Sequence, residues 1–269
     1  MSRVTLSVTV MNPAYAYIYD DFLMDQRYQD ILDSLETKLA GLGLSGRIGR
    51  LTLFRNSQEL VEDFVRQGVK NLVIVGNDNT LDKVMWFLPD LPLTMGYIPL
   101  AEPSGIARLL NIPTGLAACE VLSARLIETL DVAKLNDRYF ISEVIFENTT
   151  ATLSVDEKYK LTLTGGGTLS IRNLGHAVGS DNNLVDAQDG LLEVVLTPQG
   201  PGVKSRLWTK LKMMSAQETK VTFKSGEIVS AQPMEGQADR FGVSGFKFSV
   251  SIVPQKFKVI TGRRLRPVM

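Results

Sequence analysis

Cysteine and histidine are almost missing from this chain of 269 residues, which contains one of each. A lone cysteine, Cys119, cannot form an intramolecular disulfide, and this is typical of a protein from a reducing compartment. One cysteine and one histidine, His176, also cannot supply a structural zinc site, which uses about four such ligands. The sequence therefore predicts an intracellular protein that folds without disulfides or a zinc core.

An excess of charge and a long hydrophobic run are also missing. Lys plus Arg and Asp plus Glu are equal, at 29 each, so a general attraction to nucleic acid is not expected. The longest apolar runs, such as 72–75 and 191–196, are far shorter than the ~20 residues that span a bilayer. Residues 1–10 alternate polar and apolar side chains, unlike a signal peptide. We expect a cytoplasmic protein that meets a membrane only at its surface.

Apolar residues make up 44% of the chain, and in its first half their spacing alternates between the periods of strands and helices. The expected strands are 4–11, 49–54, 72–75 and 95–100, and the expected helices are 20–42, 57–67 (with Ser57 as N-cap), 80–88, 104–111 and 115–130. Strands separated by helices predict a parallel sheet with helices on both faces. We therefore expect a doubly wound α/β domain over residues 1–135.

The second half has a different pattern, in which short alternating runs are separated by turn residues. The expected strands are 138–148, 151–155, 159–163, 191–197, 220–223, 227–231, 246–253 and 257–260. Such a series predicts an antiparallel sandwich or barrel. We expect a β-sandwich domain on the substrate side over residues 136–260, followed by a short basic tail, 261–269.

The segment Val73–Leu81 runs from a buried strand through a tight loop into a helix. Ligands bind at the carboxyl ends of strands in open parallel sheets, and a helix N-terminus attracts phosphate. Gly76 and the neighbouring asparagines tolerate left-handed backbone angles, and Asp78 offers a carboxylate for Mg²⁺. The alternative is an ordinary Asx-type turn and helix cap, and the local residues leave both interpretations open.

The wider order of motifs resembles the diacylglycerol kinase-like lipid kinases. The run Gly76–Thr80 stands where that family has Gly-Gly-Asp-Gly-Thr, and Ile98–Arg108 stands where it has Pro-Leu-Gly-Thr-Gly-Asn-Asp-Phe-Ala-Arg. Asp186–Leu196 resembles the family's Asp-Gly-Leu-Leu-Asp-Val stretch, and Asn12-Pro13 resembles the Asn-Pro that ends its first strand. The resemblance covers nearly the whole chain. It implies a two-domain fold of the NAD kinase/diacylglycerol kinase type. It also implies an ATP- and Mg-dependent phosphorylation of a lipid hydroxyl, on a diacylglycerol-like acceptor in a cleft between the two domains.

The same resemblance implies a role for particular residues. The expected nucleotide contacts are Asn12, Gly76, Asn77, Asn79, Thr80 and Ser104, and the expected magnesium ligands are Asp78, Asp131 and Asp189. Asp78 and Glu235 are the expected catalytic residues, with Glu235 accepting the proton of the lipid hydroxyl. Each of the three aspartates also has a plain alternative as a cap, turn or surface residue.

Several positions depart from the family pattern. Two loop glycines are replaced by Asn77 and Asn79, and Ala101–Ser104 replaces Gly-Thr-Gly-Asn. Gln237 stands where the family's late Asp-Gly-Glu motif ends, and a glutamine cannot act as a base. Two hypotheses follow: an active lipid kinase, or a catalytically inactive pseudokinase that binds lipid or regulates a partner.

A basic segment, 204–214, contains no acidic residue. Its cationic and aromatic side chains are Lys204, Arg206, Trp208, Lys210 and Lys212. Such a mixture suits an anionic membrane surface, although a solvated basic helix face over a core-facing leucine stripe is the more ordinary interpretation. The expected partners are therefore a lipid substrate and, peripherally, the inner membrane face. A homodimer is implied by the resemblance alone, and nucleic acid is not expected.

Overall fold

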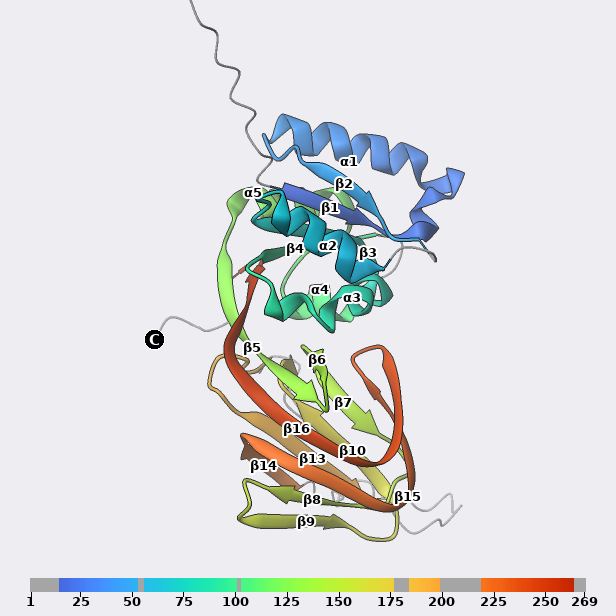
Figure 1. Cartoon of the computed structure of the whole chain (residues 1–269), viewed down its shortest axis with the longest axis vertical. Coiled ribbons are helices and arrows are strands. Elements are labelled where there is room, and N and C mark those ends of the chain that lie inside the picture. Colours follow the sequence, from blue (N-terminus) through green and yellow to red (C-terminus); the bar gives the residue numbers. More distant parts are fainter. Residues whose placement is uncertain (1–14, 53–55, 101–102, 177–183, 199–218, 264–269) are drawn as a thin grey trace, which may run out of the picture.

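The computed structural model describes residues 15–52, 56–100, 103–176, 184–198 and 219–263. In Figure 1 these residues form two lobes, one above the other. We call the upper one, from residues 15–126, the helical lobe, and the lower one, from residues 136–240, the strand lobe. The predicted strand 4–11 and most of the basic tail lie outside the described residues.

The helical lobe is built on a parallel sheet. Its strands are β1 (Tyr15–Tyr19), β2 (Arg47–Arg50), β3 (Asn71–Gly76) and β4 (Thr94–Pro99), in the spatial order β2-β1-β3-β4. Every residue of β1, β3 and β4 is buried, because helices cover both faces of the sheet. The predicted doubly wound parallel sheet is confirmed, with its topological switch point between β1 and β3.

Helices follow each of these strands. They are α1 (Gln29–Gly41), α2 (Ser57–Arg66), α3 (Asp78–Met85), α4 (Gly105–Leu109) and α5 (Ala118–Ala124), with short 3₁₀ turns η1 (Asp21–Met24), η2 (Gln26–Tyr28), η3 (Leu88–Asp90) and η4 (Gly115–Ala117). Asn56, not Ser57, caps α2, because its side chain accepts from the Gln58 N–H. No helix within the described ranges is both long and apolar enough to cross a bilayer.

The predicted helix 115–130 is wrong in its second half. It ends at Ala124, because Arg125 adopts a left-handed backbone conformation with φ of 52°. The chain then enters β5 (Ile127–Leu135), which runs from the helical lobe down into the strand lobe. Apolar residues continue at helical spacing past Arg125, so the sequence pattern alone did not mark this change.

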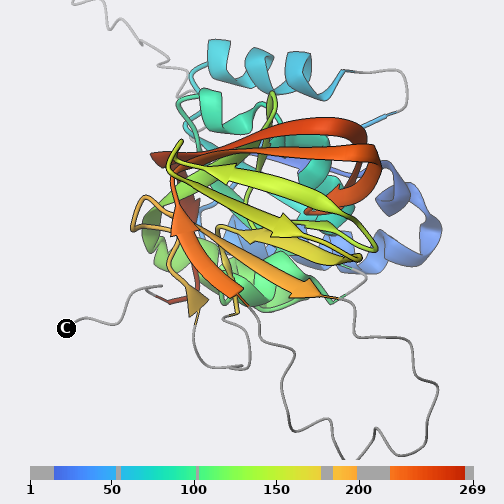
Figure 2. The same ribbon diagram turned by 90° about the horizontal axis from the view of Figure 1, so that it is seen from below.

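The strand lobe is antiparallel, as predicted. Its strands are β6 (Arg138–Phe140), β7 (Glu143–Phe146), β8 (Ala151–Val155), β9 (Tyr159–Leu163), β10 (Gly167–Arg172), β11 (Gly175–His176), β12 (Leu184–Val185), β13 (Leu192–Pro198), β14 (Thr219–Phe223) and β15 (Ser225–Ala238). Figure 2 shows these strands from below, lying across the base of the helical lobe. Alternate apolar side chains such as Phe146, Leu153 and Phe248 form a second core.

One long strand joins the two lobes. β16 (Phe241–Ile260) pairs antiparallel with β15 and β5, and its end pairs parallel with β4, where Val259 faces Met95. The sequence predicted two strands here, but the structure has one, with a bulge between Val253 and Phe257. Phe257 and Val259 pack in the core of the helical lobe. The last strand of the described chain therefore completes the first sheet.

Candidate active site

The turn between β3 and α3 is a helix cap. Asn77 is the N-cap of α3, and its side-chain oxygen accepts a hydrogen bond from the Thr80 N–H at 3.2 Å. The Thr80 hydroxyl accepts in return from the Asn77 N–H at 3.0 Å. A Cβ at Gly76 would lie 2.2 Å from the Thr80 hydroxyl oxygen, so only glycine permits this closed turn. The cap interpretation is thus the one that the structure shows for Asn77.

The first residue after β1, Asp20, is held by groups of α3 at the switch point of the sheet. Asp20, 1% exposed at the carboxyl end of β1, accepts from the Thr80 hydroxyl at 2.5 Å and from Lys83 Nζ at 2.6 Å. Burial favours the neutral acid, but hydrogen bonds with Asp21, Lys83 and Thr80 outweigh it and hold the pKa of Asp20 below its usual value.

The predicted strand that ends at Asn12 precedes the described residues, which begin with β1 at Tyr15. The residue that follows β1 at the carboxyl edge is Asp20. Asn12 itself lies outside the described residues.

Asp78 occupies the first turn of α3 and contacts β4 and the start of α4. Its carboxylate accepts hydrogen bonds from the Tyr97 hydroxyl at 3.3 Å, the Gly105 N–H at 2.9 Å and the Ser104 hydroxyl. Ser104 is also the N-cap of α4 and accepts from the Ala107 N–H. The predicted residues Asp78 and Ser104 are thus in direct contact, and they fasten the starts of two helices together.

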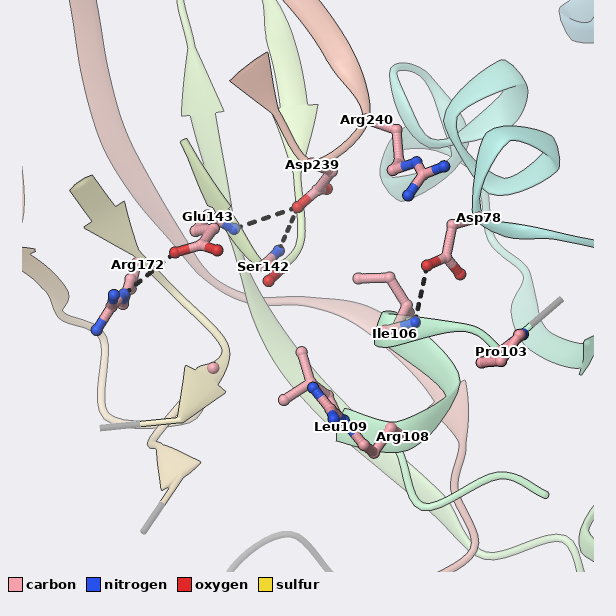
Figure 3. A pocket seen from close by; sticks show the side chains of 12 residues that line it. Asp78, Pro103, Ile106, Arg108, Leu109, Ser142, Glu143, Arg172, Asp239 and Arg240 are labelled. Carbon is pink, nitrogen blue, oxygen red and sulfur yellow. Dashed lines mark hydrogen bonds and ion pairs between the residues drawn. The ribbon is translucent and has the colours of Figure 1, made fainter. Parts of the chain in front are cut away.

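A cavity of about 400 Å³ lies between the two lobes. Its lining residues come from both of them and are Asp78, Pro103, Gly105, Ile106, Arg108, Leu109, Ser142, Glu143, Arg172, Gly175, Asp239 and Arg240. Figure 3 shows α3 and α4 on one side of this space and the strands of the lower lobe on the other. The volume falls in the range of small-molecule sites, about 300–1,000 Å³.

Asp239 is one of two acids on the strand-lobe side of the cavity, the other being Glu143. It lies in the turn between β15 and β16 with a φ of 48°, and its carboxylate accepts from the backbone N–H groups of Ile141, Ser142 and Glu143. Burial raises the pKa of Asp239 to about 6, even though these three donors lower it. Among the described residues, this carboxylate lines the cavity together with Asp78 and Glu143.

A further acid, Asp82, lies on the same face of α3 as Asp78. Asp82 is four residues beyond Asp78 in α3, and burial, followed by the charges of Asp239 and Asp78, raises its pKa to about 7. The charges of Arg240 and Arg138 oppose this shift. Asp82, Asp239 and Arg240 were not predicted from the sequence. Only the four-residue spacing from Asp78 to Asp82 was available as a signal.

Glu235 was expected to act as the base, but it lies elsewhere. Its side chain is exposed in the middle of β15, where the residue pairs with Ser244 of β16, and it does not line the cavity. The nearest acid along the chain that lines the cavity is Asp239. Gln237 is likewise exposed.

Asp131, an expected magnesium ligand, is a buried structural acceptor. It lies in β5 with 1% of its surface exposed. One carboxylate oxygen accepts from the Gln255 N–H and the other from the Gly190 N–H, both at 2.7 Å. Asp189 lies in the turn before β13, exposed, and accepts from the Leu191 N–H. In the part of the chain that is described, no three acidic, histidine or cysteine side chains are grouped closely enough to hold a metal.

Two expected nucleotide contacts, Asn79 and Thr80, and the expected membrane-surface residues remain to be placed. Asn79 is exposed, and its side-chain oxygen accepts from Arg240 Nε at 3.2 Å, whereas Thr80 is buried. The expected membrane-surface residues Lys204, Arg206, Trp208, Lys210 and Lys212 lie outside the described residues.

Asp78 still fits one contact with a magnesium ion. A carboxylate has about four acceptor positions, and Tyr97, Ser104 and Gly105 use three of those on Asp78. Mg²⁺ is usually held by one or two carboxylates together with substrate phosphates and water. The donor set therefore fits a magnesium ion that arrives with a nucleotide, but not a site made of protein groups alone.

No model of a known protein family matches the sequence. The fold is similar to the crystal structure of a diacylglycerol kinase from Bacillus anthracis str. Sterne, with a TM-score of 0.73 and 17% identity over 93% of this chain and 97% of that chain. Two further structures of proteins assigned as diacylglycerol kinases from that strain give TM-scores of 0.75 and 0.73 at 16% and 15% identity, with the same coverage. At such identities the likeness shows the fold, and the fold implied by the sequence motifs is confirmed.

Proposed function

We propose that the cavity between the lobes is the site of phosphoryl transfer from ATP to the hydroxyl group of a lipid. The observation that carries this proposal is the placement of Asp78 and Asp239 in one cavity, on different lobes. Asp78 stands at the carboxyl edge of β3, where open parallel sheets bind ligands. Asp239, with a pKa of about 6, suits a general base near neutral pH. The fold shared with diacylglycerol kinases supports the same reaction class.

Asp78 positions the phosphate donor in this proposal. A bound magnesium ion would neutralise the charge of the phosphate oxygens. The remaining acceptor position of Asp78 would contact that ion, while Ser104 and Gly105 hold the carboxylate in place. Positioning and charge stabilisation are the main contributions a protein makes to phosphoryl transfer.

Asp239 handles the proton of the acceptor. Its carboxylate would accept the hydroxyl proton as the oxygen–phosphorus bond forms, and the three backbone N–H groups of 141–143 keep it oriented. This role falls to Asp239 in place of Glu235, because Glu235 does not line the cavity.

A second candidate, a pseudokinase that binds lipid without turning it over, is favoured by one specific observation. The groups predicted to contact the nucleotide are already in contact with one another: Asn77 caps Thr80, and Ser104 donates to Asp78. ATP therefore meets fewer free donors here than a glycine-rich loop would offer.

Calorimetric titration with ATP, with and without Mg²⁺, separates the two candidates. The proposed kinase binds ATP in the presence of Mg²⁺, and Asp78→Asn weakens this binding by about 10-fold or more, because a charged ligand of the ion is lost. Asp137→Asn, an exposed acid in the turn after β5, is the matched control and leaves binding unchanged.

Turnover is then measured as transfer of the γ-phosphate of ATP to a panel of neutral and anionic lipids in vesicles. We expect transfer whose kcat/KM rises as the pH increases through about 6, the pKa of Asp239, and Asp239→Asn to lose both the rate and this pH dependence. Absence of Mg²⁺-dependent ATP binding in the folded protein refutes the kinase and leaves the lipid-binding candidate.

A further inference from the structure

Three acids and three arginines line the cavity between the lobes, but only one acid and one arginine form an ion pair with each other. Glu143 and Arg172 form an ion pair with 3.1 Å between Oε2 and Nε. The carboxylates of Asp78 and Asp239 are each held by three hydrogen bonds from hydroxyl and backbone N–H groups. None of these acids is ion-paired to Arg108 or Arg240 within the described ranges.

Arg108 and Arg240 are thus the donors left for a ligand. Arg108 lies in the last turn of α4, is exposed, and its side chain makes no hydrogen bond or ion pair with the rest of the described chain. Arg240 lies in the turn between β15 and β16, and its one hydrogen bond goes from Nε to the neutral amide of Asn79 at 3.2 Å. One arginine comes from each lobe, and both line the same cavity.

The chemistry of these two side chains points to a phosphate group. A guanidinium carries five N–H donors in a planar fork that matches phosphate oxygens. Apolar lining is restricted to a few side chains, including Ile106 and Leu109. A volume of about 400 Å³ holds a head group or a small ester, while the acyl chains of a lipid have to remain outside.

We propose that Arg108 and Arg240 bind a phosphate monoester carried by the acceptor itself, so that the substrate is an anionic molecule and not neutral diacylglycerol. The identity of the substrate rests on the proposed function, whereas the binding of the phosphate does not. The phosphate group joins the helical lobe to the strand lobe through the two arginines. The same chemistry is offered by a lipid head group and by a soluble phosphate ester.

The first test is titration of the full chain with inorganic phosphate and with glycerol 3-phosphate, followed by calorimetry. We expect both to bind, and Arg108→Gln and Arg240→Gln each to weaken binding by about 10- to 100-fold, as for loss of a charge-assisted hydrogen bond. Arg66→Gln is the matched control: Arg66 is exposed at the end of α2, pairs with Asp63, and does not line the cavity. Circular dichroism and thermal unfolding check that all variants fold.

The second test separates a lipid from a soluble ester. Flotation is compared between vesicles of phosphatidylcholine alone and vesicles that also contain phosphatidic acid. Binding that requires phosphatidic acid and is lost in the Arg108→Gln/Arg240→Gln double variant indicates a lipid head group. Binding of glycerol 3-phosphate without vesicle binding indicates a soluble ester.

Two results overturn the proposal. One is that neither phosphate, glycerol 3-phosphate nor phosphatidic acid binds to the folded protein, and the other is that both arginine variants bind them as tightly as the parent does. Failure of the kinase alone is distinct: ATP transfer is then absent, while phosphate binding and its loss in the arginine variants persist. Conversely, transfer to neutral diacylglycerol without phosphate binding refutes this inference and retains the kinase.

Discussion

Replacing Asp131 by alanine tests whether this acid is a structural acceptor or a magnesium ligand. Its carboxylate binds the N–H of Gly190 in the turn before β13 and the N–H of Gln255 in the β16 bulge. Alanine leaves both of these donors without their partner in a site where Asp131 is 1% exposed. The change therefore loosens the contacts between β5, that turn and β16.

The size of the effect follows from the two hydrogen bonds. A hydrogen bond to a charged group contributes about 1.5–3 kcal/mol, so loss of both lowers the free energy of unfolding by about 3–6 kcal/mol. For a chain of this length each kcal/mol lowers the midpoint by about 2 °C, which gives a decrease of at least about 6 °C. Asp131→Asn keeps one acceptor oxygen, so its melting temperature is expected to lie between those of the parent protein and Asp131→Ala.

Scanning calorimetry without metal and then with Mg²⁺ measures this decrease. Asp137→Ala removes an exposed acid close to Asp131 in sequence and serves as the control, with a change within about 1 °C. The structural role predicts the same decrease in both buffers. A midpoint that is unchanged without metal, or that falls only when Mg²⁺ is present, refutes the reasoning and returns Asp131 to the role of a magnesium ligand.

Two further predictions concern α3 and its cap. Gly76→Ala is expected to destabilise the fold by about 1–3 kcal/mol in chemical denaturation, because the new Cβ meets the Thr80 hydroxyl at 2.2 Å. Gly41→Ala is the control, because no atom lies within 4 Å of a Cβ at that position. Equal denaturation midpoints for the two variants contradict the closed turn. Asp82→Asn is expected to raise the melting temperature more at pH 8 than at pH 5. The folded-state pKa of Asp82, about 7, lies above its unfolded value, so stability from its proton is present at low pH and lost as the pH rises through 7. A gain that is independent of pH contradicts this assignment.

The sequence was most informative where one period dominates a segment. The strands 151–155 and 159–163 were predicted with the bounds that the structure gives to β8 and β9, because their side chains alternate cleanly. The buried strand β3 was predicted from a continuous apolar run. Two of the errors fall where a backbone conformation overrides the pattern, at Arg125 and at the bulge of β16.

The candidate site was only half visible in the sequence for a related reason. Asp78 follows a buried strand directly, so its place at the carboxyl edge was predictable. Asp239 gains its position from backbone N–H groups almost a hundred residues earlier in the chain, such as that of Ile141. The residue pattern around Asp239 does not indicate a contact with such a distant part of the chain. Glu235, which resembles a family motif, was predicted as the base although it lies in the middle of a strand.

The path of β16 has a consequence for how the chain folds as it is synthesised. The parallel sheet of the helical lobe needs Lys258 and Val259 to cover the outer edge of β4. Until those residues leave the ribosome, β4 has an open edge, and exposed edges are prone to pair with other chains. Domains generally fold in order from the N-terminus, but here the first sheet is complete only after β16, the last described strand, has been synthesised. The two lobes are therefore expected to complete folding together, and a fragment that ends before β16 is expected to aggregate.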